Sequence, residues 1–236
     1  MAKKDQTWPV EQKPISLPSF VPPPPGDVLD SMIAGIVAVR ARRPLRQFVM
    51  LGVASLVYSA LVLFLVHPRK DMPGQDATWL VGAGLVWTVG FLVPTAFALI
   101  PRKGSVMPRW RFAAVASMVT AVAFIVLGLT IHPSVPGVSL DYGTERFVHG
   151  HFCLEIGLAT ALVPVVLGAL CLRGAIPVGS RWVAAAPGAG GGGLGGLVLH
   201  LHCYVTDPLH QGVVHGGVVV VSAILSALLV PRAAES

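Results

Sequence analysis

The 236-residue sequence is poor in charge, since only 12% of its residues are Asp, Glu, Lys or Arg. Soluble domains carry about 25%, and here 54% of the residues are hydrophobic and the mean hydropathy is +0.73. This composition excludes a soluble globular protein. The sequence also lacks a nucleophile elbow, a phosphate-binding loop, a zinc-protease helix and a dinucleotide fingerprint. We therefore do not expect an enzyme.

Long hydrophobic runs occupy about half of the chain. A helix needs about 20 residues to cross a hydrocarbon core of roughly 30 Å, and six runs are long enough. Unbroken apolar runs of this length are not barrel strands. The sequence therefore predicts an all-α membrane protein, a six-helix transmembrane bundle with a cytoplasmic N-terminal segment. The expected spans are residues 47–66, 79–100, 112–131, 152–172, 183–201 and 213–230.

The net charge of +6 is distributed along the borders of these spans. The N-terminal segment, the second and fourth loops and the C-terminal tail carry 14 Lys and Arg, whereas the other three loops carry 3. By the positive-inside rule, both termini are cytoplasmic and the protein is a multi-pass component of a bacterial inner membrane. A basic patch for nucleic acid would gather on one folded face instead, so we expect the lipid bilayer as a partner and no direct nucleic-acid contact.

This orientation divides the chain into a cytoplasmic part (1–46), a transmembrane domain (47–230) and a short cytoplasmic tail (231–236). The first 26 residues are rich in proline and cannot form a packed core. After them, apolar residues recur at helical spacing and arginines gather towards the end, which is typical of an amphipathic helix. Its apolar stripe must be buried, either against the inner leaflet of the membrane or against a soluble partner protein. The stripe consists of Val28, Leu29, Met32, Ile33, Ile36 and Val37.

All eight histidines fall in or beside the three loops predicted to lie outside. Six of them form two clusters, one at the start of the fourth span and one in residues 199–216, and we expect these clusters to meet. Imidazole and thiolate ligands suit zinc or copper, so a transition metal is the candidate cofactor. The spacing matches no stringent metal signature. The candidate ligands are His149, His151, His200, His202, His210 and His215.

The residues leave other interpretations of this region open. Cys153 and Cys203 lie on the oxidising side, where a disulfide is stable. The same thiols are also suited to a redox- or metal-reactive pair that changes helix packing when modified. In the simplest alternative the histidines only line a wet interface. Glu155, just inside the fourth span, is costly unless it is paired or reaches water.

Two stretches of the chain resemble the negative regulators of sigma F, which are six-span membrane anti-sigma factors. One runs from Cys153 through Pro164 to the sequence L-R-G-A-I-P at 172–177. The other is the Gly/Ala-rich fifth span, which ends in L-H-C at 201–203 and is followed by Asp207 and Pro208. Together they cover about residues 150–210. Light-responsive regulators of carotenoid synthesis with a similar size and layout are among the proteins that the chain resembles.

The resemblance implies an integral-membrane anti-sigma factor that sequesters an extracytoplasmic-function sigma factor and releases it on light, oxidative or metal stress, thereby controlling transcription. It assigns signal perception to the outer pair Cys153 and Cys203. The chain departs from the family in having Asp-Pro-Leu-His and His215 where an aromatic-rich segment is usual, so the signal itself can differ. The residues expected to bind the sigma factor are Val28, Leu29, Met32, Ile33 and Ile36.

A different class of function is a metal-handling or small-solute transporter that uses the outer His/Cys site for entry. Transporters usually carry ionisable residues along their path through the membrane. The expected spans hold almost none, which favours the regulator.

Overall fold

The computed structural model describes residues 43–101, 108–131, 150–173, 180–205 and 207–235, together with Gly26 and Asp30. The described part contains six helices that are long and apolar enough to cross a membrane, which confirms the predicted fold class. They differ from the expected spans only at their ends. The helices are α2 (Pro44–Val66), α3 (Ala77–Leu99), α4 (Arg109–Thr130), α6 (Gly150–Leu172), α7 (Ser180–His202) and α8 (Gly216–Glu235), the last preceded by a π-helical segment, η2 (His210–His215).

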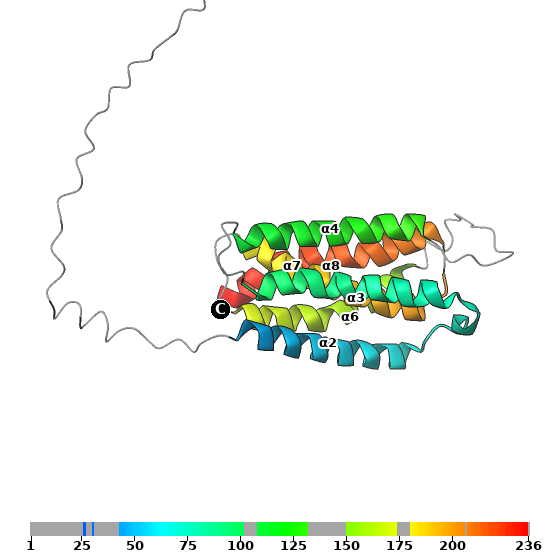
Figure 1. Cartoon of the computed structure of the whole chain (residues 1–236), viewed down its shortest axis with the longest axis horizontal. Coiled ribbons are helices and arrows are strands. Elements are labelled where there is room, and N and C mark those ends of the chain that lie inside the picture. The colour runs from blue at the N-terminus through cyan, green and yellow to red at the C-terminus, as the bar shows by residue number, and fades with distance from the viewer. Residues whose placement is uncertain are drawn as a thin grey trace, which may run out of the picture. The chain divides into compact units, whose positions relative to one another are not determined.

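Successive helices run in opposite directions through a single bundle (Figure 1). One end of the bundle carries arginines beside the starts of α2, α4 and α7, and we call it the arginine end. The other end holds the loop after α2, the start of α6, the end of α7 and η2, and we call it the histidine end. The histidines that the structure describes thus lie at one end and most of its arginines at the other, although Arg69 and Lys70 belong to the histidine end.

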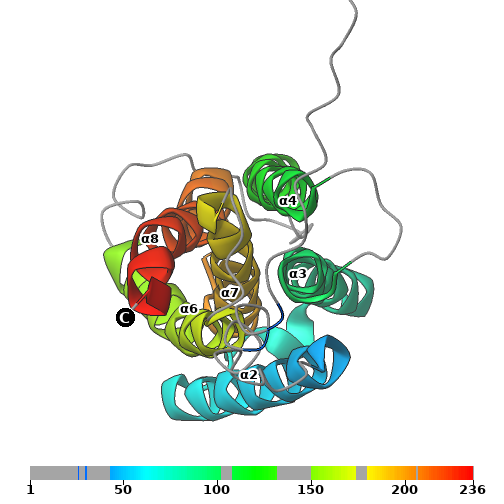
Figure 2. The ribbon, with the colours of Figure 1, turned by 90° about the vertical axis from the view of Figure 1, so that its left-hand side faces the viewer.

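Helix α7 lies in the middle of the bundle, between α8, α6, α3 and α4 (Figure 2). Of its membrane window, 89% is buried inside the protein, against 22% for α2. Glycine and alanine make this position possible, because small side chains let the backbones of neighbouring helices approach closely. The large apolar side chains of the peripheral helices, such as Val57, Phe64 and Leu65 of α2, point outwards instead.

In the sequence, Gly188, Gly192 and Gly196 recur at every fourth position, a spacing that predicts a smooth ridge for close helix packing. In the structure this ridge packs against two helices. A methyl group at Gly188 or Gly192 would meet the backbone of α8 at Ser222 or Val219. Gly196 instead lies against the ring of Trp87 on α3. The ridge therefore contacts α8 over one part of its length, at Gly188 and Gly192, and α3 over another, at Gly196.

Replacing Gly192 by alanine is expected to destabilise the bundle by about 1–3 kcal/mol, the usual cost of overpacking a tight core. The added Cβ would lie 2.5 Å from the Cα of Val219, and a backbone atom cannot move aside alone. Thermal unfolding of the detergent-solubilised protein measures the effect. Gly82→Ala is the matched control, because nothing lies within 4 Å of that position and alanine favours helix by up to about 1 kcal/mol. Equal melting temperatures for the two variants would contradict the close approach.

Candidate functional site

The loop after α2 is tied to the end of α7 by Arg69. Its backbone N–H donates to the carbonyl of Leu201 at 2.9 Å, and its buried guanidinium forms an ion pair with Asp71 at 2.6 Å. This hydrogen-bonded guanidinium holds the pKa of the Asp71 carboxyl below its usual value. The guanidinium also lies over the ring of Trp79, 5.6 Å from its centroid. Sequence reasoning counted Arg69 only as a border charge and missed this structural role.

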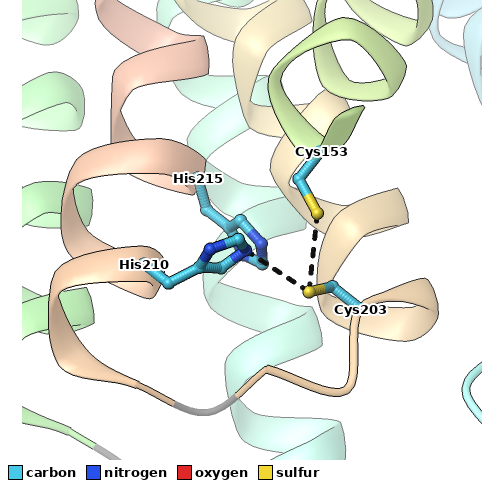
Figure 3. Close-up of side chains that lie close together, drawn as sticks. All are labelled: Cys153, Cys203, His210 and His215. Atoms are coloured by element: carbon cyan, nitrogen blue, oxygen red, sulfur yellow. Dashed lines mark hydrogen bonds between the residues drawn. The ribbon is translucent and has the colours of Figure 1, made fainter. Parts of the chain in front are cut away.

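The centre of the histidine end is a cluster of two thiols and two imidazoles (Figure 3). The Sγ atoms of Cys153 and Cys203 are 3.6 Å apart, and the Cys203 Sγ lies 3.4 Å from Nε2 of His210. The ring of His215 meets that of His210 edge to face, with centroids 5.1 Å apart. One ligand atom from each of the four residues lies within 4.8 Å of all the others. We call Cys153, Cys203, His210 and His215 the Cys/His cluster.

Three separate elements supply the Cys/His cluster. Cys153 is in the first turn of α6, Cys203 directly follows α7, and both histidines belong to η2. Cys203, His210 and His215 are buried, and Cys153 is half-buried. The two sequence clusters therefore meet at these four residues, because Cys153 comes from the start of the fourth span and the other three come from residues 199–216.

The π-helical segment is what places His210 and His215 together. On an α-helix, residues five apart point about 140° away from each other, because each residue turns by about 100°. In a π-helix the hydrogen bonds join residues i and i+5, so two residues five apart lie on nearly the same face, about one turn from each other. Sequence analysis placed this stretch in the second histidine cluster and at the start of the sixth span, but it did not predict a π-helical turn. The two histidines at i and i+5 were the only signal of the π-helical turn.

The reversal between α7 and η2 depends on Asp207. Its carboxylate accepts a hydrogen bond from the backbone N–H of Leu209 at 2.7 Å, which caps the new helix. The side-chain amide of Gln211 then donates to the carbonyl of Val205 at 2.6 Å and closes the turn from the other side. The Asp-Pro pair noted in the sequence thus shapes the turn that positions the histidines.

The structure places the other candidate ligands outside the Cys/His cluster. His200 bonds through Nε2 to the carbonyl of Leu80 at 3.0 Å, and His202 bonds through Nδ1 to the carbonyl of His67 at 2.7 Å. His151 is exposed. His149 lies outside the described residues, as do the apolar stripe residues Val28, Leu29, Met32, Ile33 and Ile36.

Glu155 and Cys171 also lie apart from the cluster. Glu155 is exposed near the start of α6 and makes no ion pair with any residue that the structure describes. Cys171 is near the end of α6, at the arginine end of the bundle. Of the three thiols, only Cys153 and Cys203 therefore lie near each other.

Comparison with known proteins identifies one family. The family model described as negative regulator of sigma F matches residues 33–235, which include all six helices and the complete Cys/His cluster. No curated protein and no solved structure matches the chain. The match extends well beyond the residues 150–210 on which the sequence resemblance depended.

Proposed function

The chain belongs to the negative regulator of sigma F family, and we propose from this membership that it is an anti-sigma factor of the bacterial inner membrane. In this proposal it sequesters an extracytoplasmic-function sigma factor and releases it on a stimulus. The observation that carries the proposal is the match over residues 33–235 to regulators of a sigma factor, on a chain with six membrane-spanning helices.

The proposal assigns sigma-factor binding to the segment before α2. The arginines beside the starts of α2, α4 and α7 favour a cytoplasmic arginine end by the positive-inside rule, and the segment joins the bundle at that end. A sigma factor is a soluble cytoplasmic protein, so its binding surface must lie on this side. The apolar stripe at 28–36 supplies side chains whose burial is worth roughly 1.5–3 kcal/mol each.

The proposal assigns perception to Cys153 and Cys203 at the opposite end. Oxidation to a disulfide would remove two protons and two electrons to an external oxidant. It would also shorten the Sγ–Sγ distance from 3.6 Å to about 2.05 Å. Because the two residues lie on α6 and at the end of α7, the change acts on the packing of the central helix. Light and oxidative or metal stress are the candidate stimuli, and control of carotenoid synthesis is the candidate output.

The residues of the central helix α7 argue against a transporter function. Between Arg181 and His200, α7 carries no ionisable side chain, and its glycines lie against the backbones or side chains of neighbouring helices. A path for a charged solute along α7 would need polar groups or ionisable residues there.

Deleting residues 1–42 tests the proposal, because it removes the N-terminal segment and leaves α2 whole. We expect transcription from a sigma-dependent reporter to become independent of the stimulus, and co-purification of the sigma factor with the membrane fraction to be lost. A deletion of residues 1–14, which spares the apolar stripe, is the control. Unchanged regulation in the 1–42 deletion, with the protein present in the membrane at normal amounts, would refute the anti-sigma function.

A further inference from the structure

The Cys/His cluster has the donor set and the spacing of a structural metal site. Two thiolates and two imidazoles bind zinc tetrahedrally, with Zn–S about 2.3 Å and Zn–N about 2.0–2.1 Å. Around a tetrahedron these bond lengths place two sulfurs about 3.8 Å apart, and a sulfur and a nitrogen about 3.6 Å apart. The Sγ–Sγ distance of 3.6 Å and the Sγ–Nε2 distance of 3.4 Å are close to these values.

His215 is an independent indication that a ligand belongs here. Its side chain is fully buried, and neither of its ring nitrogens makes a hydrogen bond of standard geometry with any described residue, although the ring lies close to the Cys203 thiol. An unsatisfied buried polar group costs about 1–3 kcal/mol, so such groups normally have a partner. The ring lies beside that of His210 and close to both thiols (Figure 3). A cation between the four residues would take a lone pair from His215 as well as from the other three.

Charge balance decides which kind of cation fits. Cysteine binds metals as thiolate, so the entering ion displaces two protons, one from Cys153 and one from Cys203. Two thiolates, two neutral imidazoles and a divalent ion have no net charge, whereas a monovalent ion would leave one negative charge. A buried net charge is costly. We infer that Cys153, Cys203, His210 and His215 bind one divalent d10 cation of the zinc class at the histidine end of the bundle.

A bound ion would join three helices at one point. It would connect the start of α6, the end of α7 and the π-helical start of the last span, and it would require the π-helical turn that brings His210 and His215 together. It would also hold both thiols as metal thiolates. This inference deepens the proposed sensor, and it rests on the proposed function only for its biological meaning, because the ligand geometry stands without it.

Metal binding to the full-length, reduced protein in detergent tests the inference. After metal has been removed with a chelator, zinc added back and unbound zinc removed, we expect one zinc per chain by elemental analysis. Cobalt(II) in place of zinc should give intense d–d bands and a thiolate-to-cobalt charge-transfer band, the signature of a tetrahedral site with sulfur ligands. Cys203→Ser and His215→Gln should abolish stoichiometric binding. Cys171→Ser and His202→Gln are the matched controls, and both should retain one zinc.

Several results would overturn the inference. Less than one zinc in the unmodified chain would do so, as would an octahedral cobalt spectrum or equal zinc binding by Cys203→Ser. Binding of copper(I) without zinc would overturn the assignment of a divalent ion. If His215→Gln does not fold, the cobalt spectrum of the unmodified chain and the variant His210→Gln still decide the question. Sigma-factor release is measured separately, so a chain that binds zinc without regulating a sigma factor contradicts only the proposed function.

Discussion

Replacing Ile33 by aspartate is expected to make sigma-dependent transcription constitutive. Ile33 lies within the apolar stripe that we propose binds the sigma factor. Losing the burial of one such side chain costs roughly 1.5–3 kcal/mol, which corresponds to roughly a 10- to 150-fold loss of affinity. A carboxylate in an apolar contact adds a desolvation cost, so the total loss should exceed this range. Affinity is measured between the purified sigma factor and the full-length protein in detergent.

The matched control for Ile33→Asp is Ala38→Asp. It adds the same charge to the same predicted helix, but helical spacing places Ala38 on the side opposite the stripe. We expect affinity close to that of the unmodified chain, since no apolar contact is lost there. If both variants lower affinity equally, the effect comes from the added charge and the stripe is not the binding surface. If neither does, residues 28–36 do not hold the sigma factor.

Replacing Cys203 by serine is expected to abolish induction of the sigma-dependent reporter by hydrogen peroxide. Serine preserves the size of the side chain but cannot form a disulfide or a thiolate. Because Cys153 has only Cys203 as a neighbouring thiol among the described cysteines, Cys153→Ser should show the same loss, and the double variant should show no additional effect. Such non-additivity is expected of two residues that act as one unit.

Cys171→Ser is the matched control for this experiment, since it removes the thiol at the arginine end and leaves the pair intact. It should respond to peroxide like the unmodified chain. Illumination and zinc salts, applied in parallel, show whether one thiol pair serves all candidate stimuli. Normal induction by all three in Cys203→Ser would exclude the pair from perception.

The sequence determined the membrane-spanning architecture of this protein. Crossing a bilayer requires about 20 apolar residues whose backbone hydrogen bonds are internal, and this demand can be read from composition and length alone. The charge asymmetry between loops likewise predicts an orientation, because it depends only on where Lys and Arg stand relative to the spans. The glycine ridge of α7 can also be read from the sequence, because Gly188, Gly192 and Gly196 recur at every fourth position. Only the structure shows that the ridge contacts both α8 and α3.

Only the tertiary structure decided which histidines join the thiols. His200 and His202 directly precede Cys203 in the sequence, yet helix geometry turns them towards the carbonyl groups of Leu80 and His67. His210 and His215 lie further along the chain, and a π-helical turn together with the Asp207 reversal brings them to Cys203. Distance along the chain does not decide which ligands meet, because that depends on the helical register and on how three helix ends pack.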